Sequence, residues 1–130
     1  MQNADTAFAG ASLPATSPST GVQTVDIDLA ERSYPIAIAA GLLTTPAIYA
    51  ALPQATAALI INNTTEEPLY TDALRTALAP KYAQVHTVVL PDGEAHKTWQ
   101  TLNLIFDALL QHGCDRKTVL FALGGGVVGD

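Results

Sequence analysis

The string GGGVVGD at residues 124–130 fits the pattern G-x-G-x-x-G through Gly124, Gly126 and Gly129. A glycine tolerates positive φ and lets a backbone come close to a pyrophosphate, whose charge a helix N-terminus then favours. The pattern alone is weak, because a glycine-rich turn that merely closes a strand contains the same residues. It also follows the last predicted strand, whereas dinucleotide-binding folds usually carry it after the first.

The segment PDGEAHK at residues 91–97 places two carboxylates and an ammonium group within six positions, at Asp92, Glu94 and Lys97. Carboxylates bind ribose hydroxyls, and a lysine binds a ribose or phosphate oxygen. A solvated turn with Gly93 at its bend and an ion pair between Glu94 and Lys97 accounts for the same residues. Composition alone favours this second interpretation.

Other catalytic chemistry has less support. His86, His96 and His112 lack the spacing of metal ligands, and we expect structural or surface roles for them. Cys114 is the only cysteine, which excludes an internal disulfide and a cysteine-built zinc site. Nothing resembles a nucleophile–base pair. We therefore assign no catalytic residue and no metal ligand to this chain.

Composition narrows the function classes further. The 130 residues include 6 basic and 12 acidic side chains, and the formal net charge of −6 argues against binding to nucleic acid or an anionic membrane. Hydrophobic residues make up 48% and charged residues 14%, which is typical of one folded domain. No apolar run approaches the ~20 residues of a membrane helix. We expect a soluble, cytoplasmic protein.

Periodicity predicts the elements that position these segments. Residues 1–23 show none and are interpreted as a disordered leader. Residues 24–29 and 33–39 alternate as an antiparallel strand pair, followed by a short helix from Thr44 or Thr45 to Ala51. Strands and helices then alternate: strands 57–61, 84–90 and 118–123, and helices 68–78 and 98–112, the latter with one apolar stripe of Trp99, Leu102, Ile105, Phe106, Leu109 and Leu110.

This order predicts an α/β fold, Rossmann-like, with a mostly parallel sheet and flanking helices. Ligands of such sheets bind at the carboxyl ends of the strands. Residues 62–65, 91–97 and 124–130 each follow a strand, so all three segments are expected at one edge of the sheet.

Taken together, PDGEAHK, a helix and then LFALGGGVVGD closely resemble the N-terminal half of the 3-dehydroquinate synthase family, a branch of the sugar-phosphate cyclase superfamily. The resemblance covers about residues 24–130 and includes the strand RSYPI. It implies an NAD-binding α/β domain that works with a mostly helical, metal-carrying C-terminal domain. The family converts 3-deoxy-D-arabino-heptulosonate 7-phosphate to 3-dehydroquinate plus phosphate in the shikimate pathway of aromatic amino-acid synthesis, and it uses NAD transiently.

The resemblance also implies roles for particular residues. Asp92, Glu94 and Lys97 would contact the adenosine-side ribose of NAD, and Asp130 would face its nicotinamide end. The remaining cofactor-binding positions are Asn63 and Thr65 near the adenosine ribose, the backbone of Gly125, Gly126, Val127 and Val128 at the pyrophosphate, and Gly93 and Gly129 within the same motifs.

The family's metal ligands, for zinc or cobalt, and its substrate-binding residues lie beyond residue 130. We therefore expect this chain to be an inactive fragment of an enzyme that is a homodimer when complete. The helix that holds the pyrophosphate is expected to begin only at Asp130, so NAD binding by the chain alone should be weak or absent. Two alternatives stay open: a related sugar-phosphate cyclase or glycerol-dehydrogenase-like enzyme, and a non-catalytic nucleotide-binding module.

Overall fold

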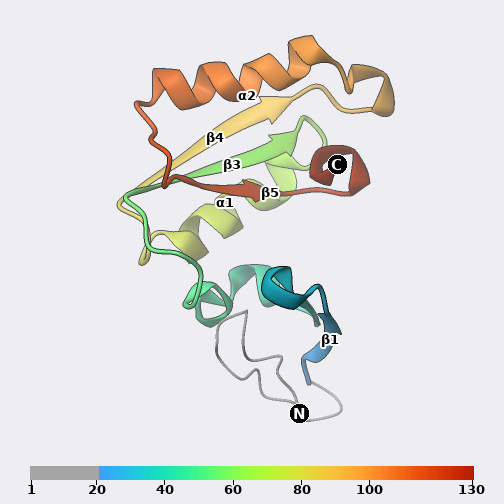
Figure 1. Ribbon diagram of the computed structural model, residues 1–130. Helices are drawn as coiled ribbons and strands as arrows, with labels where there is room; N and C mark the ends of the chain where they lie inside the picture. Colours follow the sequence, from blue (N-terminus) through green and yellow to red (C-terminus); the bar gives the residue numbers. More distant parts are fainter. Residues whose placement is uncertain (1–20) are drawn as a thin grey trace. The chain divides into compact units, whose positions relative to one another are not determined.

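The computed structural model describes residues 21–130, so most of the predicted leader, residues 1–20, lies outside the described residues. The chain divides after Pro53 into two compact units (Figure 1). None of the helices within residues 21–130 combines the length and hydropathy needed to cross a membrane.

The first unit contains the predicted hairpin. Strands β1 (Gln23–Ile27) and β2 (Tyr34–Ile38) pair antiparallel, with Val25 opposite Ile36. The 3₁₀ turn η1 (Ala30–Arg32) connects them. Gln23 is therefore part of the strand and was wrongly placed in the leader, because a polar residue at a strand end carries no periodic signal.

The short helix predicted after the hairpin is instead two 3₁₀ turns, η2 (Leu42–Thr44) and η3 (Pro46–Tyr49). The hydroxyls of Thr44 and Thr45 donate back to the Gly41 carbonyl at 3.1 and 2.9 Å, so neither side chain caps a following helix. Pro46 does occupy the predicted first turn, where its missing N–H is tolerated. Segments this short rarely support regular α-helix.

The second unit is a three-stranded parallel sheet in the order β4-β3-β5. Its strands are β3 (Ala57–Asn63), β4 (Gln84–Leu90) and β5 (Val119–Ala122). Helix α1 (Glu67–Leu78) follows β3, the 3₁₀ turn η4 (Glu94–His96) and helix α2 (Trp99–Gln111) follow β4, and helix α3 (Gly126–Gly129) follows β5. The predicted strand–helix alternation and parallel sheet are confirmed.

Two boundaries differ from the prediction. Strand β3 continues through Asn62 and Asn63, which pair with Val89 and Leu90 of β4, because ladder hydrogen bonds hold polar residues that the apolar pattern leaves out. Helix α3 begins at Gly126, four residues before the predicted start at Asp130. The glycine-rich loop therefore already contains the first helical turn.

The core lies on both faces of β3, every residue of which is buried, as expected for the central strand of a parallel sheet. On one face Leu59 and Ile61 pack with Leu90 and with Ala108 of α2. The other face carries Ala58 and Ile60 on the side of α1, whose buried residues are Thr71, Leu74, Ala77 and Leu78. Helices α1 and α2 thus cover opposite faces of the sheet (Figure 1).

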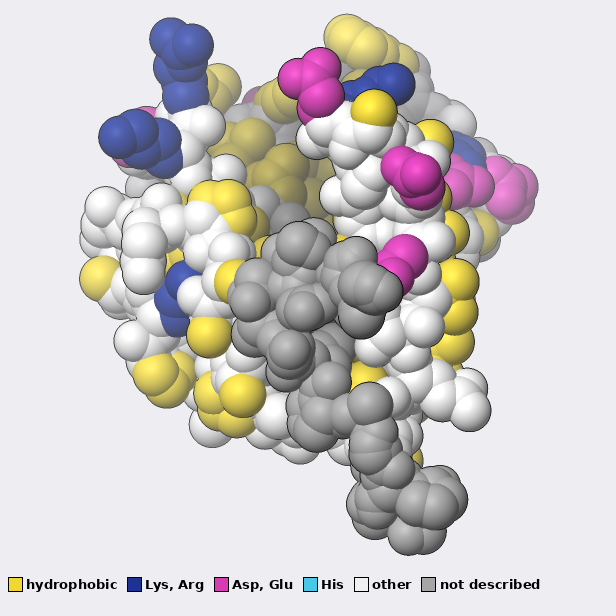
Figure 2. All heavy atoms as spheres, turned by 60° about the horizontal axis from the view of Figure 1, so that its bottom comes forward, with side chains coloured by type: hydrophobic (Ala, Val, Ile, Leu, Met, Phe, Trp, Pro, Cys, Tyr) yellow, Lys and Arg dark blue, Asp and Glu magenta, His cyan; other side chains and the backbone are white. Residues whose placement is uncertain are grey.

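The apolar stripe predicted for helix α2 is only partly covered by the rest of the unit. Ile105 and Leu109 pack on the core, whereas Trp99 is 69% exposed and Leu110 is 80% exposed. Trp99, Phe106 and Leu110 are separated by seven and four residues, and this spacing gathers them along the exposed edge of the stripe. Hydrophobic side chains reach the surface elsewhere too, among sparse charged ones (Figure 2).

Candidate functional site

The segments that follow the three parallel strands meet at one edge of the sheet, as predicted. The Thr64 N–H donates to the Leu90 carbonyl at 3.1 Å, and the Leu123 N–H donates to the Ile61 carbonyl at 2.8 Å. The Thr65 hydroxyl donates to Asp92 Oδ2 at 2.5 Å, which joins the turn after β3 to the loop after β4. No motif or periodicity predicted this last contact.

Asn63 shapes the turn after β3. Its Oδ1 accepts hydrogen bonds from the Thr65 N–H at 2.9 Å and the Glu66 N–H at 2.8 Å. These two bonds fold the turn that starts α1, whose N-cap residue Glu66 supplies no side-chain cap. Asn63 therefore positions Thr65, and its side-chain oxygen binds backbone N–H groups.

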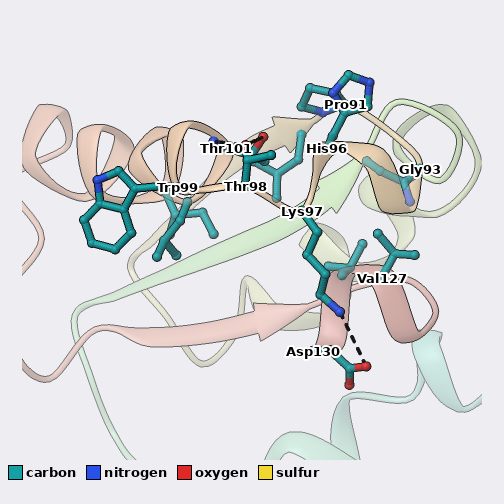
Figure 3. Close-up of a pocket in the computed structure, with 14 residues that line it drawn as sticks. Pro91, Gly93, His96, Lys97, Thr98, Trp99, Thr101, Val127 and Asp130 are labelled. Carbon is teal, nitrogen blue, oxygen red and sulfur yellow. Dashed lines mark hydrogen bonds and ion pairs between the residues drawn. The ribbon is translucent and has the colours of Figure 1, made fainter.

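Lys97 connects two of the converging loops. Its Nζ lies 3.6 Å from Glu94 Oε2 and also 3.6 Å from Asp130 Oδ2, as Figure 3 shows for the second pair. The pair with Glu94 was predicted, and the pair with Asp130 comes from the fold. Exposed ion pairs contribute little to stability, so the value of this arrangement lies in where it places a cation.

A cavity of about 260 Å³ lies beside Lys97 (Figure 3). Of the predicted cofactor-binding residues, six line it: Asn63, Gly93, Lys97, Val127, Val128 and Asp130. The other six do not: Thr65, Asp92, Glu94, Gly125, Gly126 and Gly129. The three of these with polar side chains are exposed and lie in the turns beside the cavity. Thr65 is hydrogen-bonded to Asp92, and Glu94 forms an ion pair with Lys97.

Sequence reasoning missed the apolar wall of the cavity. The additional lining residues are Leu90, Pro91, His96, Thr98, Trp99, Thr101, Leu102 and Ile105. Leu90 precedes the PDGEAHK motif, Pro91 and His96 belong to it, and the others follow it into the first two turns of α2. Thr98 caps this helix by accepting from the Thr101 N–H. The predicted start of this helix immediately after the motif was the signal that could have found them.

The glycines of the last loop have different requirements. Gly124 has φ +148°, and a Cβ built on it would lie 2.8 Å from Val128 Cγ2, so only glycine fits this position. A Cβ on Gly125 would meet no atom within 4 Å, because the space beside this residue is open. The loop is therefore closed against α3 at Gly124 and accessible at Gly125.

The remaining titratable candidates lie apart from the cavity. The rings of His86 and His112 stack with centroids 4.0 Å apart. Burial lowers the pKa of His86, and the charges of His112 and Arg75 lower it further. Within residues 21–130 no group of three His, Cys, Asp or Glu side chains is placed to hold a metal ion, so these residues do not fit the metal that the resemblance implies.

Comparisons with known proteins bear on the fold and on the sequence of residues 87–130. The family model of the 3-dehydroquinate synthase N-terminal domain matches residues 87–130. A structure of 2-deoxy-scyllo-inosose synthase complexed with carbaglucose-6-phosphate, NAD⁺ and Co²⁺ matches with a TM-score of 0.72 and 21% identity, over 82% of this chain and 29% of that one. A second structure of 2-deoxy-scyllo-inosose synthase matches with the same TM-score and identity, over 82% of this chain and 30% of that one.

The parallel sheet with helices on both faces defines a Rossmann-like α/β protein. Residues 87–130 of this protein match the family model of the 3-dehydroquinate synthase N-terminal domain, which supports the predicted resemblance for that segment. The chain spans about three-tenths of the length of the solved structures that it matches.

Proposed function

We propose that this chain is the NAD-binding part of a sugar-phosphate cyclase, and that the complete enzyme is a 3-dehydroquinate synthase. The observation that carries the proposal is the position of Lys97, which lies between Glu94 and Asp130 at a cavity with an otherwise largely apolar wall. A small number of charged groups on an apolar cavity is typical of cofactor sites.

The residues of this chain fit the parts of a dinucleotide. The Asp92 carboxylate, held by the Thr65 hydroxyl, and Glu94 would accept hydrogen bonds from ribose hydroxyls, while Lys97 would donate to a ribose or phosphate oxygen. The open space at Gly125 leaves room for a pyrophosphate to approach the backbone. NAD would supply a hydride acceptor that is regenerated within each turnover, and these residues would bind and orient it.

Helix α3 begins at Gly126 and residues of this chain form the cavity, so we propose, against the expectation of weak or absent binding, that the chain alone binds NAD. We therefore expect saturable binding, measured by isothermal titration calorimetry. Lys97→Met should weaken it about tenfold or more, since charge-assisted hydrogen bonds contribute about 1.5–3 kcal/mol.

The matched control is Lys117→Met, which removes an exposed lysine outside the cavity and should leave the NAD affinity unchanged. Equal affinities for the wild type, Lys97→Met and Lys117→Met would contradict the site. Absence of NAD binding by a folded wild-type chain would contradict the proposed function.

A related cyclase is the second candidate, because the solved structures that match are 2-deoxy-scyllo-inosose synthases. An assay of phosphate release by the complete enzyme distinguishes the two candidates. Release from 3-deoxy-D-arabino-heptulosonate 7-phosphate would support the first, and release from a hexose 6-phosphate would support the second. We propose that the complete enzyme is a cytoplasmic homodimer and that this chain alone releases no phosphate from either compound. Phosphate release by the purified chain would overturn that last point.

A further inference from the structure

Asn62 is a polar residue at a fully buried position. Its side chain is 0% exposed, and it follows Ala58 and Ile60 on the face of β3 that α1 covers. Its Nδ2 donates a hydrogen bond to the hydroxyl of Thr71, which is 2% exposed. The bond joins the end of the central strand to the second turn of α1.

The Asn62–Thr71 pair is not expected to increase the stability of the fold. Among residues 21–130, Asn62 Oδ1 has no hydrogen-bond partner, and a buried acceptor without a partner lowers stability. An apolar pair of similar volume leaves no polar group unsatisfied, and such replacements are often neutral or stabilising. A different property must therefore account for Asn62 and Thr71.

That property is geometric. The side-chain hydrogen bond joins the two ends of the segment from Asn62 to Thr71, and this segment contains the whole turn after β3. Inside this closed segment, Asn63 folds the turn through the Thr65 and Glu66 N–H groups, and the Thr65 hydroxyl holds Asp92 Oδ2. A directional bond fixes the rotation of α1 on the sheet, which packing between smooth apolar surfaces fixes less strictly.

We propose that Asn62 and Thr71 are positioning residues for the nucleotide site: their bond sets the orientation of α1 and, through it, the turn that presents Thr65 to Asp92. The inference deepens the proposed function and rests on it for its consequence, which is NAD affinity. Its structural part concerns the turn itself and is measurable without any ligand.

The test compares amide hydrogen exchange and unfolding free energy in the full 130-residue chain. The double variant Asn62→Leu/Thr71→Val replaces both polar partners by apolar residues with the same side-chain branching and number of heavy atoms. We expect it to be at least as stable as the wild type, yet to exchange the Thr65 and Glu66 amides about tenfold faster, while amides of β3 and β4 are unchanged.

Two single variants on α1 serve as controls. Thr71→Ser keeps the hydroxyl and should preserve slow exchange at Thr65 and Glu66. Thr76→Val removes a hydroxyl that donates to the Asp72 carbonyl at 2.9 Å, away from the turn, and should also leave these two amides unchanged. If the double variant does not fold, Thr71→Val compared with Thr71→Ser provides the same contrast.

The proposal would be overturned if the Thr65 and Glu66 amides of the double variant exchanged at the wild-type rate. It would also be overturned if all amides exchanged faster in proportion to a loss of global stability. Calorimetric titration with NAD forms the second arm, in which the double variant should bind severalfold more weakly. If the wild type binds no NAD, the proposed function fails, while the exchange measurement still decides whether Asn62 and Thr71 position the turn.

Discussion

Alanine substitutions at the adjacent residues Gly124 and Gly125 should affect different properties. The first should destabilise the fold, and the second should weaken NAD binding. Gly124 has φ +148°, and a Cβ there would lie 2.8 Å from Val128 Cγ2 and 3.2 Å from Val128 Cβ. Gly125 has an extended backbone with φ −88°, and a Cβ there would meet no atom within 4 Å. The structure thus predicts a folding defect for Gly124→Ala alone.

The size of that defect follows from two contributions. A non-glycine residue in a sparsely populated backbone region costs about 1–3 kcal/mol. Overpacking against a short, branched side chain such as Val128 costs about 1–3 kcal/mol more. Gly124→Ala should therefore lower the free energy of unfolding by about 2–6 kcal/mol, a large share of the total for a small domain. Gly125→Ala should change it by less than about 0.5 kcal/mol.

Urea unfolding followed by circular dichroism measures both variants, and NAD titration calorimetry measures binding by those that fold. Gly113→Ala separates backbone strain from crowding, because Gly113 has φ +65° with open space around its Cβ position. It should cost less than Gly124→Ala. We expect Gly125→Ala to fold normally and lose NAD affinity, since its methyl group occupies the space proposed for the pyrophosphate. A Gly124→Ala protein as stable as the wild type would refute this description of the loop.

Two further predictions concern stability. Leu59→Ala should lower the free energy of unfolding by about 2–5 kcal/mol, because Leu59 is fully buried in the core. Leu120→Ala should lower it clearly less, because Leu120 is 50% exposed. Equal effects of the two variants in urea unfolding would contradict the assigned core. Burial, and then the charges of His112 and Arg75, lower the pKa of His86 in the folded state. The unfolded chain therefore binds more protons, and stability should fall as pH drops below the ordinary histidine value of about 6.5. His86→Gln should reduce this dependence in urea unfolding between about pH 7 and pH 5, and an unchanged slope would argue against it.

Periodicity predicted the second unit well because its strands are largely apolar and helices α1 and α2 are long enough to show a 3.6-residue repeat. Residues 84–90 were placed with their observed boundaries, and α2 was found within one residue at each end. The convergence of the three loops followed from topology alone, since parallel strands end at the same edge.

What the sequence did not predict are contacts between segments that are far apart along the chain. The pair between Lys97 and Asp130 and the bond from Thr65 to Asp92 depend on how the loops are oriented in space. The exposed face of α2 was missed for a related reason. Hydrophobicity identifies an apolar side chain such as Leu110, but it does not say whether another element covers it.

The most direct test of the central claim uses Trp99, the only tryptophan in the chain and a residue that lines the cavity. Tryptophan emission overlaps the absorption of reduced nicotinamide, so NADH bound beside Trp99 quenches its fluorescence by energy transfer. N-acetyltryptophanamide titrated in parallel corrects for absorption by the free nucleotide. The structure predicts quenching that saturates with NADH, reverses on addition of NAD and weakens in Lys97→Met. No transfer up to about 1 mM NADH in a folded chain would contradict a nucleotide site at this cavity.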